Sequence, residues 1–268
     1  NITNNSLIIA STDPGQKYGI KIDGNLNVVE NNSVSSSGSN SMNLIYLDSQ
    51  DTYAHNLIKN NTVFVNDTSG SSGIVVTNSF DNNTIESNVV TVIGSSSHTG
   101  IIANPSLGAY GTSVYNNSVF VEGITLVSGI SNSGNFGATI ENNTVRSNAT
   151  GGYAVGVEVG VNPANVTNNS VVVYSEVLGA TAGKGLSIST GNTGEYLFDG
   201  NSVTVYGSFS YPIYFTAADV NLTNSVLSGD SGWIRTDGTG VINVTGITFS
   251  TSNGSLEYSS NFTMVDAD

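Results

Sequence analysis

Apolar and polar residues alternate in short segments that recur at a nearly constant distance along the chain. Eight segments share an asparagine with an apolar residue three positions before it and another two positions after it. These asparagines are Asn5, Asn32, Asn61, Asn88, Asn117, Asn143, Asn169 and Asn201, and they recur at nearly even steps. A regular period of this kind indicates a repeat architecture.

A second marker recurs with the same period, about twelve positions after the asparagine in most repeats. It pairs a glycine with alternating apolar residues, as in "YGIKID" (18–23), "SGIVVT" (72–77) and "TGIIAN" (99–104). Each repeat thus holds three short segments with period two, which is typical of strands, and no segment of helical length shows a 3.6-residue period.

These repeats predict the fold. A unit of about 27 residues with three short strands cannot bury its apolar side alone, so each strand must pair with its copy one turn later. The sequence therefore predicts an all-β, right-handed parallel β-helix with three short parallel sheets and about nine to ten coils. We expect a single domain over residues 1–268, with shorter and less regular coils from about 225 to 268.

The repeated asparagine is expected to have a structural role. In a stack of coils the same turn position recurs one strand spacing above itself. An asparagine there tolerates the left-handed conformation of a sharp turn, and its amide can hydrogen-bond to the identical amides above and below. We therefore predict that the eight asparagines form a ladder inside the rod.

The residue before the ladder asparagine often begins an N-x-S/T sequence, the glycosylation acceptor of secreted proteins. It is replaced by Ser87 and Gly200 in two coils. Candidate glycosylation sites in this and other positions are Asn4, Asn31, Asn60, Asn66, Asn82, Asn116, Asn142, Asn148, Asn168 and Asn253.

Composition narrows the possible functions. The chain has six Lys and Arg against twenty Asp and Glu, a net charge of -14, so nucleic-acid binding is not expected and polyanionic substrates are disfavoured. It has no cysteine, which excludes disulfides and thiolate metal sites. No apolar run approaches the roughly 20 residues that span a bilayer. No signal peptide is visible and the chain opens inside a repeat, so we interpret it as a mature fragment or an excised domain.

Two carboxylates are candidates for chemistry. Asp23 and Asp48 occupy equivalent outward positions in successive coils, and a separation of about 5 Å would suit a retaining glycosidase or a Ca²⁺ site. The alternative, which we prefer, is a pair of solvated carboxylates at strand ends. Glu30, Glu86 and Glu141 share another outward column with Lys59.

The remaining polar residues do not predict catalysis. His55 and His98 fall in different positions of different coils, so we expect both in loops without a metal partner. The six basic residues are scattered, unlike the catalytic cations of β-helical lyases. We therefore predict no enzymatic activity, no metal and no cofactor.

Aromatic residues concentrate in the later coils. Alternation places Phe198 and Phe215 inside the rod, and Tyr206, Tyr211 and Tyr214 are candidates for outward positions. Exposed tyrosines on a rigid rod can stack on sugar rings. The alternative is that the later coils are wider and need larger side chains to fill them.

With its NN[ST]V and GI repeats, the chain resembles the adhesin-like surface proteins of methanogenic archaea, which are long, acidic parallel β-helix chains. The resemblance implies extracellular display and attachment to a cell-surface glycan or protein. A second possibility is a subunit of a sheath, surface layer or filament that assembles with further copies of itself through open β-helix ends. A third is a polysaccharide lyase or glycosidase.

Overall fold

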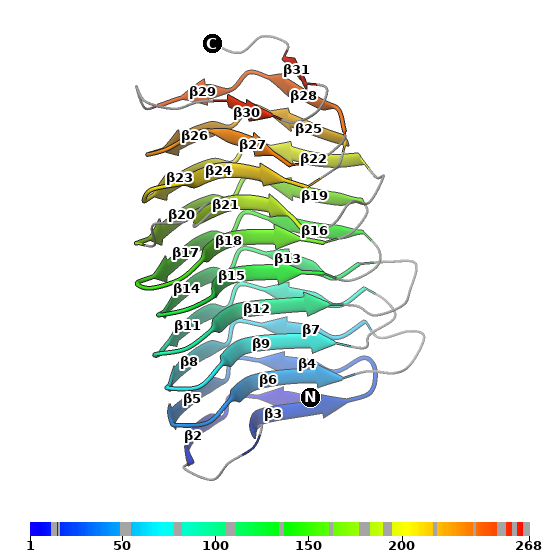
Figure 1. Cartoon of the computed structure of the whole chain (residues 1–268). Helices are drawn as coiled ribbons and strands as arrows, with labels where there is room; N and C mark the ends of the chain where they lie inside the picture. The colour runs from blue at the N-terminus through cyan, green and yellow to red at the C-terminus, as the bar shows by residue number, and fades with distance from the viewer. Residues whose placement is uncertain are drawn as a thin grey trace.

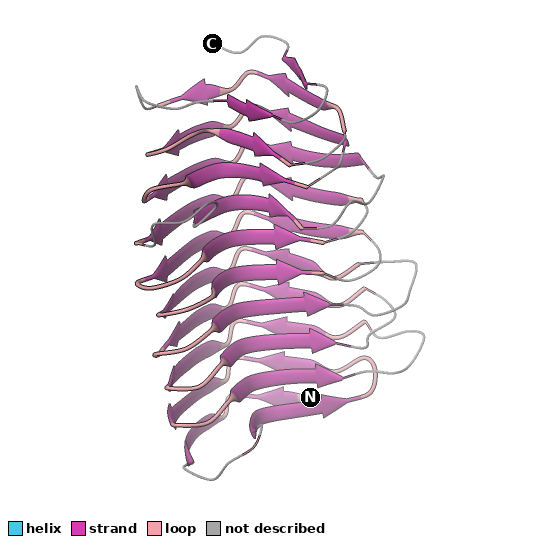
Figure 2. Cartoon of the chain, in the orientation of Figure 1, coloured by secondary structure: helices cyan, strands magenta, loops and turns pink. Residues whose placement is uncertain are grey.

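The computed structural model describes residues 1–11, 15, 17–48, 55–77, 82–104, 111–133, 137–160, 163–176, 183–189, 195–216, 219–237, 240–250, 256–258 and 262–264. All regular structure in these residues is β, and the strands form three parallel sheets stacked along a rod (Figures 1 and 2). The predicted fold class is confirmed.

Each coil contributes one strand to every sheet, in the order sheet A, sheet B, sheet C. Sheet A contains β1 Ile2–Thr3, β4 Val28–Glu30, β7 Leu57–Lys59, β10 Thr84–Glu86, β13 Ser113–Tyr115, β16 Ala138–Glu141, β19 Ala164–Thr167, β22 Glu195–Asp199, β25 Asp219–Thr223, β28 Ile242–Thr245 and β31 Phe262–Met264.

Sheet B follows after one sharp turn in each coil. It contains β2 Ser6–Ser11, β5 Ser33–Gly38, β8 Thr62–Asp67, β11 Val89–Ile93, β14 Ser118–Gly123, β17 Thr144–Ala149, β20 Ser170–Ser175, β23 Ser202–Tyr206, β26 Val226–Gly229 and β29 Thr248–Phe249.

Sheet C faces the viewer in Figure 1. It contains β3 Lys17–Asp23, β6 Met42–Asp48, β9 Ser71–Thr77, β12 His98–Asn104, β15 Val127–Asn132, β18 Ala154–Val159, β21 Gly183–Ile188, β24 Ser210–Phe215, β27 Ile234–Thr236 and β30 Leu256–Tyr258. The chain rises from the N-terminus to the C-terminus as it winds, and the winding is right-handed (Figure 1).

The strand register reproduces the sequence period. Ile2 pairs with Val29 and Val29 pairs with Ile58, the apolar positions that precede successive ladder asparagines. In the last coils the step along the chain is shorter, as in the pairing of Val220 with Ile242. The shorter step begins earlier than residue 225, since Phe198 already pairs with Leu222.

The core is built from columns of inward side chains. The apolar residue two positions after each ladder asparagine is buried along sheet B from Val34 onward, and the one three positions before it is buried along sheet A from Val29 onward. Burying such a side chain stabilises the fold by roughly 1.5–3 kcal/mol. Phe198 and Phe215 lie inside as predicted, with ring centroids 5.5 Å apart.

The glycines of the second marker face these columns. A Cβ placed on Gly129 would overlap the Val145 side chain and lie 2.6 Å from the Gly156 carbonyl oxygen. Gly73, Gly100, Gly156 and Gly185 meet a valine of sheet B in the same way. The two sequence markers therefore pack against each other.

Candidate functional site

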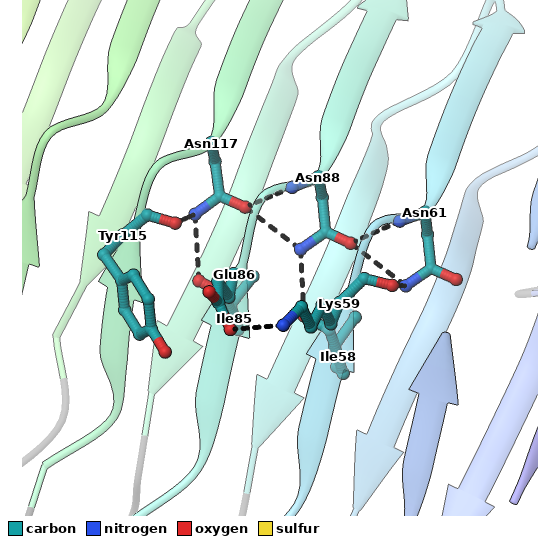
Figure 3. A network of polar contacts seen from close by, with 8 residues as sticks. All are labelled: Ile58, Lys59, Asn61, Ile85, Glu86, Asn88, Tyr115 and Asn117. Carbon is teal, nitrogen blue, oxygen red and sulfur yellow. Dashed lines mark hydrogen bonds and ion pairs between the residues drawn. The ribbon is translucent and has the colours of Figure 1, made fainter. Parts of the chain in front are cut away.

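The eight repeated asparagines lie in one column at the turn between sheets A and B. From Asn5 to Asn169, the backbone N–H and the Nδ2 of each one both donate to Oδ1 of the next, at 2.9–3.1 Å. Figure 3 shows Asn61, Asn88 and Asn117, whose amides also reach main-chain carbonyls, such as that of Ile85 at 2.9 Å. From Asn32 on, every member is buried. From Asn32 on, the column cross-links the coils and leaves no exposed polar side chain available to a ligand, whereas Asn5 is exposed.

One detail of the predicted turn is wrong. The left-handed backbone does not belong to the ladder asparagine but to the residue before it, with φ of 55° at Asn142 and 65° at Gly200. The ladder residue instead directs its backbone N–H at the next coil. The first residue of each pair therefore makes the turn, and the second makes the cross-links.

A second, shorter ladder was not predicted. It lies at the entry to sheet A, where Asn27 and Asn56 each donate through N–H and Nδ2 to Oδ1 of the next coil's asparagine. Asn56 and Asn83 are buried. The signal was available in the sequence, since Asn27, Asn56 and Asn83 each stand five positions before a member of the main ladder.

The candidate glycosylation sites are mostly exposed. Asn4, Asn31, Asn60, Asn116, Asn142 and Asn168 share the left-handed corner column, while Asn66 and Asn82 are exposed elsewhere. Asn148 is half-buried and donates to Glu122 at 3.2 Å. Asn253 lies outside the described residues.

Aromatic side chains and one arginine line the outer face of sheet B. Tyr174 and Tyr206 stack with ring centroids 4.6 Å apart and planes 16° apart. The Arg146 guanidinium lies 5.0 Å from the Tyr174 ring and 5.6 Å from the Phe120 ring, the range of cation–π contacts. We call Phe120, Arg146, Tyr174 and Tyr206 the aromatic column.

A shallow hollow of ≈ 470 Å³ adjoins this column, lined in part by Arg146, Asn148, Glu176 and the two stacked tyrosines. Tyr206 is 41% exposed. An aromatic face beside amide, carboxylate and guanidinium groups can stack on a sugar ring and hydrogen-bond its hydroxyls.

Tyr211 and Tyr214 were expected outside, yet they are only 2% and 7% exposed. Both point away from the lumen but are covered by charged neighbours on sheet C. Lys184 lies 3.9 Å from the Tyr214 ring centroid, and the Arg235 guanidinium lies 5.4 Å from the Tyr211 ring. Of the three candidate tyrosines, only Tyr206 is therefore exposed to solvent.

Lys184, Tyr211, Tyr214, Arg235 and Asp237 form a charged cluster on sheet C. Two of the six basic residues therefore lie in one cluster, and the expectation that all of them are scattered is wrong. Arg235 and Tyr214 both donate to the Asp237 carboxylate, at 3.0 and 2.7 Å. Burial, with added effect from Asp237, raises the pKa of Tyr214 to about 12. Burial alone would raise the pKa of Asp237, but the bonds from Tyr214 and Arg235 and the nearby positive charges outweigh it and hold that pKa below its usual value. The charges of Arg235 and Asp237 are therefore paired within the cluster, and the Tyr214 hydroxyl stays protonated.

The candidate carboxylates occupy the expected outward columns. Asp23 and Asp48 are register partners on β3 and β6, and Asp23 pairs with Lys21 at 3.5 Å. In the other column Lys59 lies 3.5 Å from Glu86 (Figure 3). No group of three or more potential metal-binding side chains occurs among the residues that the structure describes.

A buried polar group lies at the inner corner between sheets B and C. The Asp67 carboxylate accepts hydrogen bonds from Ser36 at 3.2 Å and Ser71 at 3.3 Å, and its other oxygen has no partner among the described residues. Despite these bonds, burial raises the pKa of Asp67.

His98, expected in a loop, begins β12 and is buried. Its two ring nitrogens face the backbone N–H groups of Ser71 and Ser96 at 3.4 and 3.3 Å. Burial lowers the pKa of His98, against the opposing effect of the Ser71 contact. His55 is exposed, as a loop position predicts.

Comparison with known proteins adds no relative. No family model, no curated protein and no solved structure matches the chain. Across the described ranges, no helix has the length and apolar character needed to cross a membrane.

Proposed function

We propose that this chain is a rod of an extracellular, adhesin-like surface protein that binds a glycan without chemically changing it. The observation that carries the proposal is the aromatic column, in which Tyr206 is exposed and stacked on Tyr174 beside the hollow of sheet B. The asparagine ladders support it, because they hold the strands under the column in a fixed register and leave little conformational entropy to lose on binding.

The charged cluster of sheet C favours binding over lyase chemistry. A tyrosine that removes a proton in a lyase needs a pKa near the working pH. The Tyr214 pKa of about 12 keeps its hydroxyl as a donor to Asp237. The Arg235 guanidinium is paired with the same carboxylate at 3.0 Å.

An array of immobilised glycans tests the proposal. We expect the purified chain to bind a subset of glycans and Tyr206→Ala to lower that binding by about tenfold, the loss of roughly 1.4 kcal/mol of stacking. Tyr153→Ala is the matched control, because Tyr153 is 50% exposed but lies outside the aromatic column. Unchanged binding in Tyr206→Ala, or equal losses in both variants, would refute the role of this face.

A further inference from the structure

A larger hollow lies on the outer face of sheet C, over β6, β9 and β12. Its volume is ≈ 680 Å³. It is separate from the aromatic column, which belongs to sheet B, and the proposed function above does not use it.

Two polar side chains open onto this hollow without a partner. Asn43 and Ser72 are register partners on neighbouring strands, and each is only 8% exposed. Neither side chain forms a hydrogen bond within the part of the chain that the structure describes. The polar atoms of both side chains stay accessible from the hollow, so water or a ligand in it can supply the missing hydrogen-bond partners.

The rest of the lining combines apolar and hydroxyl groups. Val75, 3% exposed, and Ile102 occupy successive positions of the neighbouring outward column. Tyr46 adjoins them in the same column, and its hydroxyl accepts a hydrogen bond from Thr77 at 3.1 Å. The Tyr46 ring is itself held by Tyr18, with centroids 4.6 Å apart.

Every described residue that lines the hollow is uncharged, in a chain with a net charge of -14. A bound anion would meet no cation among them, and a bound cation would meet no carboxylate. The lining suits a ligand whose groups both donate and accept hydrogen bonds and whose remaining surface is apolar.

We propose that this hollow binds a neutral oligosaccharide. Asn43 and Ser72 hydrogen-bond ring hydroxyls along one side, and the C–H faces of the sugar pack on Val75 and Ile102. Tyr46 and Thr77 contribute hydroxyl groups beside this apolar strip. The strands below repeat at roughly 4.8 Å, which is close to the length of one pyranose unit, so successive sugars meet successive coils.

Calorimetric titration of the whole chain with cellotetraose, mannotetraose and tetragalacturonate tests this assignment. We expect at least one neutral tetrasaccharide to bind, with tetragalacturonate at least about tenfold weaker. Asn43→Asp keeps the shape of the side chain but adds a negative charge and removes two donors. Ile102→Lys places a long charged chain on the apolar strip. Each is expected to lower the affinity about tenfold or more, Asn43→Asp by losing a polar contact and Ile102→Lys by removing apolar contact area and obstructing the strip.

Two control variants separate this site from other causes. Ser131→Lys adds the same charge one coil beyond Ile102 in the same column, outside the hollow, and is expected to bind like the unaltered chain. Tyr206→Ala removes the sheet B site and is also expected to leave this affinity unchanged, so failure of either site is distinguishable from failure of the other.

Three results would overturn the proposal: no neutral tetrasaccharide in the panel binds, tetragalacturonate binds as tightly, or folded Asn43→Asp and Ile102→Lys variants keep full affinity. Circular dichroism and the unfolding midpoint establish that each variant is folded. Tyr46→Phe removes a single oxygen and replaces either variant that fails to fold, with an expected loss of a few-fold.

Discussion

Replacing Asn143 by alanine tests the ladder at its centre. Asn143 Nδ2 donates to Oδ1 of Asn169 and to the carbonyls of Val114 and Glu141, at 2.9–3.0 Å. Its Oδ1 accepts the backbone N–H and the Nδ2 of Asn117, at 2.9 and 3.0 Å. The alanine variant leaves the buried Asn117 N–H without its acceptor, and the Val114 carbonyl, which is also paired in the ladder of β13 with β16, loses one of its donors.

The magnitude follows from the Asn117 N–H. A buried polar group that loses its partner costs about 1–3 kcal/mol, so we expect Asn143→Ala to lower the free energy of unfolding by at least that amount, about 1–3 kcal/mol. For a chain of this size that corresponds to a fall in Tm of roughly 2–12 °C.

The neighbouring residue provides the control. Asn142 is exposed, with φ of 55° and a single side-chain bond to Glu141. Glycine adopts this left-handed backbone conformation readily, as Gly200 does two coils later. We therefore expect Asn142→Gly to leave the free energy of unfolding almost unchanged. Asn142→Ala should cost about 1 kcal/mol, because a side chain with a Cβ disfavours the left-handed region.

Thermal and urea unfolding followed by far-ultraviolet circular dichroism, which reports the loss of β structure, measures all three variants. The reasoning requires the order Asn143→Ala, Asn142→Ala, Asn142→Gly from least to most stable. Equal unfolding midpoints for Asn143→Ala and Asn142→Gly would show that the ladder contributes no measurable stability.

Three further predictions concern other parts of the rod. Because burial lowers the pKa of His98 below 6.5, the unfolded chain binds more protons in acid, so the free energy of unfolding should fall as the pH drops below about 6.5. Urea titrations at several pH values should show this slope, and His98→Gln should lack it. Gly129→Ala should unfold at a clearly lower temperature, since its Cβ would collide with Val145 and the Gly156 carbonyl; an unchanged midpoint would contradict the close packing of the two markers. Arg235→Met removes the 3.0 Å bond to Asp237 and should raise the Asp237 pKa, seen as a shifted carboxyl titration by NMR; an unmoved titration would rule out that bond as its cause.

The sequence by itself determined the architecture. Each coil repeats the same inward and outward pattern, so the repeat period fixed the strand positions, the inward columns and the ladder position. Phe198 and Phe215 could be placed inside for the same reason, because alternation along a strand decides which way a side chain points.

Only the tertiary structure decided which side chains contact one another on the outer surface of the rod. The alternation of residues along β24 predicts that Tyr211 and Tyr214 point outward. Their burial, however, depends on Lys184 and Arg235, which lie in the preceding and the following coil. Arg146 likewise contacts the Phe120 ring of the preceding coil and the Tyr174 ring of the next coil, which lies two residues beyond the register partner of Arg146. Apart from the exposed corner before each ladder asparagine, the outer positions carry no repeated pattern, because nothing in the stacking of coils requires one. Which outward side chains meet is therefore set by register and rotamer, and the surfaces proposed to bind glycans could be located only once the coils were stacked.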